Sequence, residues 1–171
     1  MIESTVINNN FSLIPLGKNA KDGYAIIDLD DLELVSKSNW WLGKNGYVYN
    51  SEHLGYSNGK RIQKSTLLHR HILNPPDHAR IDHINNNPLD CRKKNLRYAT
   101  VSQNAQNRPK QKNNKSGYKG VHKSHNKTNP FRAQIKINHR SIKLGYFKTA
   151  KDAHQAYLSA AKKHFGEFAH G

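Results

Sequence analysis

The most regular pattern of apolar and polar residues lies in the last third of the chain. Every second residue from Phe131 to Ile137 is apolar, which predicts a strand with one buried face. The positions on the other face are all polar, namely Arg132, Gln134, Lys136 and Asn138. A strand with one apolar and one cationic face is suited to a sheet that packs on a helix and turns its open side toward DNA.

The segments around this strand complete a small domain. Residues 118–123 and 141–147 predict two further strands, the second following a tight turn that makes an antiparallel pair. Thr149 and Asp152 form a capping-box pattern that predicts the start of a helix. The side chains expected on its covered face recur at helical spacing: Ala153, Ala156, Tyr157, Ala160 and His164. We therefore expect three strands and one helix, with the cationic face open.

The elements of the first hundred residues are shorter. Residues 24–29 predict a strand, and residues 40–49 predict a hairpin with Asn45-Gly46 at its turn. Residues 60–66 indicate a further strand, and the apolar run 67–73 ends at Asn74-Pro75-Pro76. We interpret the acidic residues at 28–33 as a solvated strand end rather than a metal site. The fold class is α+β, with an N-terminal β-hairpin region.

Charge separates the two parts of the chain. The 171 residues carry 28 basic and 12 acidic side chains, a net charge of +16. Residues 1–105 hold 13 basic and 10 acidic residues, whereas residues 106–171 hold 15 basic and 2 acidic residues, a net charge of +13. So concentrated a positive charge predicts a polyanionic partner, with nucleic acid ahead of an anionic membrane. The polar, basic stretch 106–116 is expected to be an exposed linker.

Composition excludes several classes of protein. Hydrophobic residues make up 35% of the chain, which favours small cores over one large core. No apolar run approaches the ~18–20 residues that a membrane-spanning helix needs. The single cysteine, Cys91, excludes an internal disulfide and cysteine-based zinc modules. With this cysteine usage a reducing compartment is the default. The N-terminus shows no pattern of a secretory signal, and we expect no membrane partner.

Residues 79–107 carry the candidate chemistry. A short strand ends at Asp82-His83, a loop rich in Asn and Pro follows, residues 95–100 return as a strand, and a helix begins at Thr100 or Ser102. Asp82 and Asn104 offer the oxygen ligands that Mg²⁺ prefers. His83 titrates near neutral pH and can take a proton from an attacking water. This order of residue types suits metal-assisted hydrolysis of a phosphodiester.

The stretch from Leu68 to Asn107 closely resembles the HNH nuclease motif of phage and intron-encoded homing endonucleases, which has the ββα-metal fold. The resemblance is carried by HR at 69–70, then DHINNNPLDCRKKNLRYAT, then QNAQN. Residues 117–169, from SGYKGV to the helix ending in HFGEFA, look like an AP2/ERF-type DNA-binding domain. Together the resemblances cover roughly residues 11–170. They imply a nuclease domain at 1–105, a basic linker at 106–116 and a DNA-binding domain at 117–171.

The resemblance also implies roles for single residues. His83 matches the catalytic general base, and Asn95 matches the middle letter of the motif, which braces its loop. Asn104 matches the third letter, which binds one divalent ion, Mg²⁺ or Mn²⁺, together with Asp82. His69 and Arg70 match supporting positions that contact phosphate or pack the motif, and these two alternatives stay open. Asn107 is a substitute ligand if Asn104 does not serve.

The AP2/ERF-like part is expected to lie in the major groove of DNA. The alternating strand supplies Arg132, Gln134 and Lys136, of which Arg and Gln can read base edges and Lys contacts phosphates. Basic residues of the neighbouring segments are expected to help: Lys119, Lys123, Arg140 and Lys143.

The sequence therefore predicts a metal-dependent, site-specific endonuclease of the homing type, acting on double-stranded DNA as a monomer in the cytoplasm of a bacterial or phage-infected cell. Two alternatives stay open at this stage. One is a DNA-binding regulator in which the nuclease motif is inactive. The other is an RNA-binding or RNA-cleaving protein, for which the sheet lacks an outward aromatic pair.

Overall fold

The computed structural model describes residues 5–8, 10–18, 21–111 and 113–170. The chain forms two compact units, Met1–Ala99 and Thr100–Gly171. The division lies ahead of the expected linker at 106–116, because helix α3 (Val101–Asn107) groups with the second unit. Lys112 of that linker lies outside the described residues. No helix of the described residues is long and apolar enough to cross a membrane.

The described residues of the first unit form three small antiparallel sheets. The first has the order β1-β2-β3, and its strands are Thr5–Asn8, Phe11–Pro15 and Tyr24–Asp28. A 3₁₀ turn (Leu29–Asp31) and α1 (Leu32–Val35) lead to the second sheet, in which β4 (Trp41–Leu42) pairs with β5 (Val48–Ser57) and β5 with β6 (Lys60–Leu67). The third consists of β7 (Arg80–His83) and β8 (Leu96–Ala99). The predicted strand at 24–29 and hairpin at 40–49 are confirmed.

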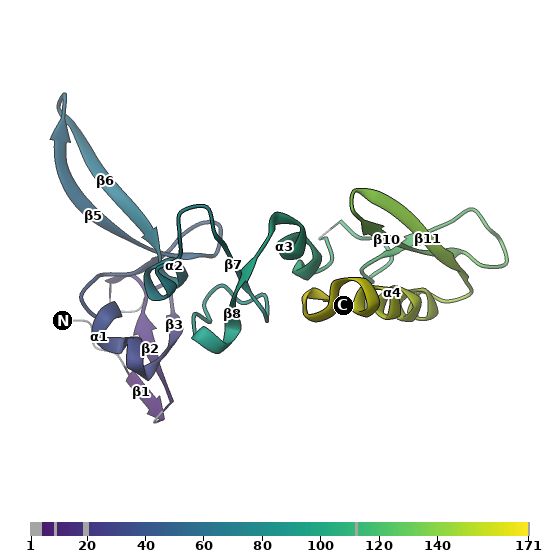
Figure 1. Ribbon diagram of the computed structural model, residues 1–171, viewed down its shortest axis with the longest axis horizontal. Helices are drawn as coiled ribbons and strands as arrows, with labels where there is room; N and C mark the ends of the chain where they lie inside the picture. Colours follow the sequence, from purple (N-terminus) through teal and green to yellow (C-terminus); the bar gives the residue numbers. More distant parts are fainter. Residues whose placement is uncertain (1–4, 9, 19–20, 112, 171) are drawn as a thin grey trace. The chain divides into compact units, whose positions relative to one another are not determined.

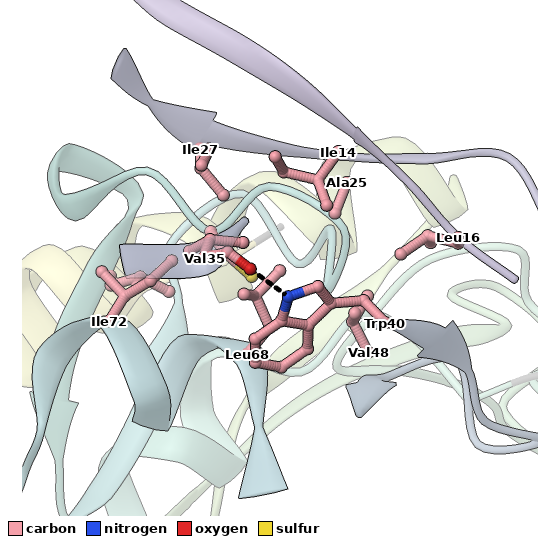
Figure 2. Packing of buried hydrophobic residues seen from close by; sticks show 11 residues of the cluster. Ile14, Leu16, Ala25, Ile27, Val35, Trp40, Val48, Leu68 and Ile72 are labelled. Carbon is pink, nitrogen blue, oxygen red and sulfur yellow. Dashed lines mark hydrogen bonds between the residues drawn. The ribbon is translucent and has the colours of Figure 1, made fainter. Parts of the chain in front are cut away.

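A buried tryptophan organises the core of this unit (Figure 2). The Trp40 indole donates its N–H to the carbonyl of Val35 at 2.9 Å, so its polar atom is satisfied while its rings are buried. The side chains around it come from the first sheet, from β5 and from α2 (Leu68–Leu73), and include Ile14, Leu16, Ile27, Val48 and Leu68. Helix α2 ends at Leu73, and the capping residue Asn74 takes a left-handed conformation (φ 42°) directly before Pro75.

The second unit has the predicted three strands and one long helix (Figure 1). Strands β9 (Val121–Lys123), β10 (Phe131–Ile137) and β11 (Arg140–Phe147) form an antiparallel sheet in the order β11-β10-β9, and α4 (Ala150–Phe165) packs on it. The cap is as expected, because the Thr149 hydroxyl accepts from the backbone N–H of Asp152 at 3.1 Å. The expected helix face needs one correction, since His164 is exposed and Ala161 is buried.

One glycine of this unit is required by close packing. Gly120 has φ +75°, and a Cβ there would lie 2.0 Å from the Tyr157 ring. The Gly120 carbonyl also accepts from the backbone N–H of Gln134 at 2.8 Å. The glycine therefore lets the chain pass between α4 and the sheet, where a side chain would displace the helix.

Candidate active site

Strands β7 and β8 place Asp82 and His83 at the end of a two-stranded ladder. Asp82 pairs with Arg97 across the ladder, and His83 pairs with Leu96. Since side chains alternate along a strand, Asp82 and His83 leave β7 on opposite faces. The Arg97 guanidinium donates to Asp82 Oδ2 from Nε at 3.0 Å and from Nη2 at 2.8 Å. Both side chains are almost fully buried, so this ion pair fixes the Asp82 carboxylate beside the histidine.

The His83 imidazole is enclosed by aromatic rings and a thiol. Its ring centroid lies 5.0 Å from that of His69 in an edge-on arrangement and 6.0 Å from that of Tyr47. Nε2 of His83 lies 3.9 Å from the buried Sγ of Cys91. These neighbours come from α2, from the loop before β5 and from the loop between β7 and β8, so three segments hold the ring in one orientation.

Burial sets the protonation state of His83. Desolvation lowers its pKa below the usual 6.5, and the nearby carboxylates of Asp82 and Asp90 oppose that shift. The imidazole is therefore neutral near neutral pH, which is the form that accepts a proton.

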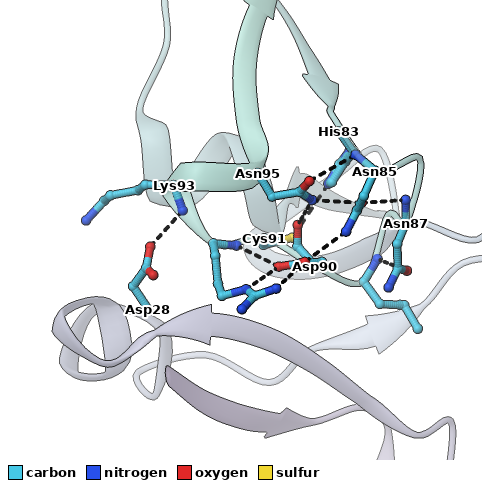
Figure 3. A network of polar contacts seen from close by, with 10 residues as sticks. Asp28, His83, Asn85, Asn87, Asp90, Cys91, Lys93 and Asn95 are labelled. Carbon is cyan, nitrogen blue, oxygen red and sulfur yellow. Dashed lines mark hydrogen bonds and ion pairs between the residues drawn. The ribbon is translucent and has the colours of Figure 1, made fainter. Parts of the chain in front are cut away.

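The loop between β7 and β8 is held by one asparagine (Figure 3). The Asn95 amide nitrogen donates to the backbone carbonyl of Asp90 at 2.7 Å and to Asn85 Oδ1 at 2.9 Å, and its oxygen accepts from the Asn85 backbone N–H at 3.0 Å. The Arg92 guanidinium donates to both carboxylate oxygens of Asp90, from Nε at 2.7 Å and from Nη2 at 2.6 Å. Asn95 thus braces the loop, as the resemblance implied, and it does so from a buried position.

The same loop is attached to the first sheet. Backbone hydrogen bonds join Ile26 of β3 to Leu89 and Cys91, each at 2.8 Å. The Lys93 backbone N–H donates to Asp28 at 2.7 Å, and its ammonium pairs with the buried Asp31 at 2.6 Å. The interpretation of residues 28–33 as a solvated strand end is therefore wrong for Asp31, which anchors the loop.

His69 and Arg70 both support the fold of the motif. His69 is buried against His83, as described above. The Arg70 guanidinium donates to the carbonyls of Ala79 at 2.7 Å and Pro76 at 3.0 Å, which holds the turn that leads into β7. Of the two open alternatives, packing of the motif accounts for these contacts, and a phosphate contact stays a prediction.

The remaining expected ligands lie on α3 in the second unit. Thr100 caps this helix through a capping box with Gln103, so the predicted start at Thr100 is confirmed. Asn104 is partly exposed, whereas Asn107, one turn later, is 2% exposed. Of the two amides, the one on Asn104 is the better placed to meet an ion. Its approach to Asp82 stays a prediction.

The donor chemistry of the motif fits a hard cation. Among the described residues, no three His, Cys, Asp or Glu side chains gather as a metal cluster, as a tetrahedral zinc site would need. Mg²⁺ needs less from the protein, because it keeps several waters and is held by one or two carboxylates together with substrate phosphates. Asp82 supplies such a carboxylate at the end of β7.

The register of the second sheet sorts the predicted DNA-binding residues. Cross-strand partners share a face, so Arg132, Gln134 and Lys136 lie on the open face with Lys143 of β11. Lys123 pairs with Phe131 and Arg140 with Ile137, which places both on the side covered by α4 and corrects their expected position. His122 and Tyr146 also lie on the open face, opposite Arg132, and were missed. Lys143 Nζ lies 5.2 Å from the Tyr146 ring centroid.

Lys119 also differs from its expected role. Its ammonium donates to the carbonyl of Gln106 at 2.7 Å and to that of His170 at 2.8 Å. Burial lowers its pKa to about 8. The side chain ties the end of α3 to the C-terminal segment, so we do not expect it to contact DNA.

We expect the first unit to lose stability on mild acidification. Burial, aided by the charges of His83 and Arg70, lowers the pKa of His69 to about 3. An unfolded chain binds this proton below pH 6.5 and the folded unit does not, so stability is complete above pH 6.5 and falls toward pH 3. Between pH 7.5 and pH 5 the free energy of unfolding should fall by about 2 kcal/mol.

Urea melts of the full chain in EDTA at the two pH values would measure this loss. His69→Gln should make the pH dependence shallower, leaving the part that comes from His83, whereas His78→Gln, at an exposed histidine, should leave it as in the unsubstituted chain. An equal slope in all three proteins would contradict the assignment to His69.

The motif and the chain as a whole are both similar to HNH endonucleases. A family model described as HNH endonuclease matches residues 74–106, which span β7, the braced loop, β8 and most of α3. A protein of Acanthamoeba polyphaga mimivirus described as an uncharacterized HNH endonuclease is 34% identical over 161 residues. That similarity covers 93% of this chain and 78% of the relative. No solved structure matches.

Proposed function

The chain belongs to the HNH endonuclease family, and from this premise we propose that it is a metal-dependent, site-specific endonuclease that hydrolyses phosphodiester bonds of double-stranded DNA. The observation that carries the proposal is the neutral, buried His83 beside the fixed Asp82 carboxylate. A histidine kept neutral can take a proton, and a carboxylate next to it can hold a cation.

Because the His83 and Asp82 side chains leave β7 on opposite faces, we assign them different roles, His83 as proton acceptor and Asp82 as cation ligand. His83 would accept the proton of the attacking water, after which the new oxygen–phosphorus bond forms and the bond to the 3′ oxygen breaks. The ring contacts with His69 and Tyr47 would keep the imidazole in place during this transfer. Asn95 takes no direct part, since its hydrogen bonds are made within the loop.

HNH nucleases generally use a divalent metal ion. In this chain Asp82 and Asn104 would hold one Mg²⁺ or Mn²⁺. When bound, such an ion supplies positive charge to the scissile phosphate and to the departing 3′ oxygen. The ion pair with Arg97 keeps the Asp82 carboxylate oriented for this task.

The second unit would position the nuclease on DNA. Its sheet leaves an open face with Arg132, Gln134, Lys136 and Lys143, next to the concentrated positive charge of residues 106–171. This arrangement supports an AP2/ERF-like mode of groove binding, and with it a homing-type preference for one DNA site. With a single nuclease motif, a monomer would nick one strand at a time.

Nicking of supercoiled plasmid tests the proposed function. The full chain should convert supercoiled circles to relaxed circles in Mg²⁺ or Mn²⁺, and EDTA should stop the conversion. Salt-dependent DNA binding without cleavage in either metal would contradict the proposal and favour a DNA-binding regulator. Cleavage of single-stranded RNA in preference to duplex DNA would also contradict it.

The open face of the second sheet should dominate the salt dependence of DNA binding. The double variant Lys136→Ala/Lys143→Ala removes two exposed cations of this face. Each lost phosphate contact lowers the slope of log K against log salt by about 0.9, so we expect a slope smaller by about 1.8. Fluorescence anisotropy with a labelled duplex of about 40 base pairs would measure this slope. The titrations would be repeated at salt concentrations between about 50 and 200 mM.

A matched control removes the same charge from the covered side. Lys123→Ala/Arg140→Ala loses two cations whose cross-strand partners are Phe131 and Ile137, and it should change the slope much less. If the two double variants lose affinity equally, net charge alone binds DNA and the open face has no special role.

A further inference from the structure

The hairpin of β5 and β6 projects from the first unit with little to pack against (Figure 1). Its strands pair from Tyr49 and Leu67 at the base to Ser57 and Lys60 at the turn. Strand β4 covers only the base, since its partners in β5 are Val48 and Tyr49. Most side chains from residue 52 to residue 65 are exposed. A two-stranded ribbon of this kind is only marginally stable by itself in water. Its length therefore indicates that a binding partner covers it.

The outer half of the hairpin exposes apolar as well as basic side chains. Leu54 is 54% exposed, Tyr56 71% and Ile62 41%. Residues 51–65 have a net charge of +2, because they contain three basic residues, Lys60, Arg61 and Lys64, and one acidic residue, Glu52. Large apolar side chains on an exposed ribbon indicate a surface that is covered when the protein works.

One face of the ribbon carries a set of groups suited to nucleic acid. Cross-strand pairs put Tyr56 with Arg61 and His53 with Gln63 on the same face. The His53 ring lies edge-on to Tyr56, with centroids 5.1 Å apart, and accepts from Arg61 Nε at 3.4 Å. The guanidinium is thus held beside the His53 ring, and Gln63 lies on the same face. Arg and Gln are the side chains that make paired hydrogen bonds to guanine and adenine edges.

A simpler explanation accounts for part of this pattern. Lysines on a strand edge prevent pairing with another chain, and β6 is the edge of its sheet. That explanation covers Lys60 and Lys64, but it gives no reason for exposing Leu54, Tyr56 and Ile62. It also gives no reason for the organised cluster around Arg61.

We propose that the β5–β6 hairpin is a second DNA-binding arm, which enters a groove of the duplex with the face that carries His53, Tyr56, Arg61 and Gln63. This inference rests on the proposed function and adds a binding surface outside both the nuclease motif and the C-terminal sheet. The major groove is wide enough for a two-stranded ribbon. Basic side chains along the ribbon contact phosphates on the groove walls, and the apolar side chains near the turn contact sugars and base methyl groups.

DNA binding by the full chain tests the arm. Arg61→Ala/Gln63→Ala, which removes two groups of the proposed face, should raise the dissociation constant for duplex DNA about tenfold or more, and should lower the salt slope by about 0.9. On a plasmid fragment that contains a nicking site, hydroxyl-radical footprinting should lose protection on one flank. The control Lys18→Ala/Lys37→Ala removes two exposed cations from the same unit outside the hairpin, and should shift affinity less than threefold.

The proposal is overturned if the hairpin variant binds like the control and keeps the whole footprint while the unsubstituted chain still nicks DNA. It is also overturned if Leu54→Ser/Tyr56→Ser changes the sedimentation coefficient and not the DNA affinity, because a second copy of the chain is then the partner. If the unsubstituted chain neither binds nor nicks DNA, the proposed function itself fails. Equal melting temperatures of all variants would show that the substitutions leave the fold intact.

Discussion

His83→Ala should abolish nicking of DNA while leaving DNA binding unchanged. A positioned general base contributes about 10²–10⁴-fold to the rate, so we expect a loss in this range at saturating Mg²⁺. The reason is the arrangement of the ring, which burial keeps neutral and which His69 and Tyr47 hold in one orientation. Single-turnover nicking of plasmid, followed on agarose gels, would measure the loss.

Two controls separate chemistry from folding and binding. His83→Gln keeps a polar side chain of similar volume and should be nearly as inactive as His83→Ala, with a melting temperature closer to that of the unsubstituted chain. His78→Ala removes an exposed histidine from the same unit and should keep full activity. Nicking by both His83 variants at the unsubstituted rate would refute the assignment of His83 as the base.

Asn95→Ala should cost more stability than any other single change in the motif loop. It removes three hydrogen bonds from a buried position and leaves the Asp90 carbonyl and the backbone N–H and side-chain oxygen of Asn85 without these partners. The buried Asp90 carbonyl left unsatisfied costs about 1–3 kcal/mol and each of the two bonds to the exposed Asn85 adds about 0.5–1.5 kcal/mol, so the expected loss is about 3 kcal/mol. Equilibrium unfolding in urea, followed by the fluorescence of Trp40 and Trp41, would measure it.

Asn87→Ala is the matched control in the same loop. Asn87 is exposed, and its side-chain oxygen accepts one hydrogen bond, from the Leu89 backbone N–H at 3.1 Å. Its removal should cost about 1 kcal/mol or less. A loss at Asn95 no larger than the loss at Asn87 would mean that the loop is held mainly by Arg92, Lys93 and the backbone contacts to β3.

The elements predicted best from sequence are those with one buried face. The alternation from Phe131 to Ile137 became β10 because α4 covers one side of that sheet, and Thr149 capped the helix as its neighbours required. The order of strand, loop, strand and helix from residue 79 to 107 was also correct, since Asp82-His83 and the Thr100 cap mark element ends. In both cases local chemistry and packing favour the same structure.

Features that depend on distant partners were not predicted. The ion pair of Asp82 with Arg97 and that of Asp31 with Lys93 follow from strand register and loop packing, which no local pattern reveals. Lys119 looked like one more exposed cation, yet two backbone carbonyls hold it. The strand predicted at 60–66 is confirmed as β6, but its pairing with a long β5 was missed. The turn signal Asn58-Gly59, which takes positive φ values, was present, yet the polar outer part of β5 shows no regular hydrophobic period.

The central claim is that Asp82, His83 and Asn104 act on one phosphate, and a crystal structure of the chain with duplex DNA and Mn²⁺ tests it most directly. We expect one ion within about 2.0–2.4 Å of an Asp82 carboxylate oxygen and the Asn104 side-chain oxygen. We also expect a phosphate oxygen on that ion and the His83 imidazole within hydrogen-bond reach of a water aligned with the phosphorus. An ion bound elsewhere, with Asn104 directed away from Asp82, would contradict the account.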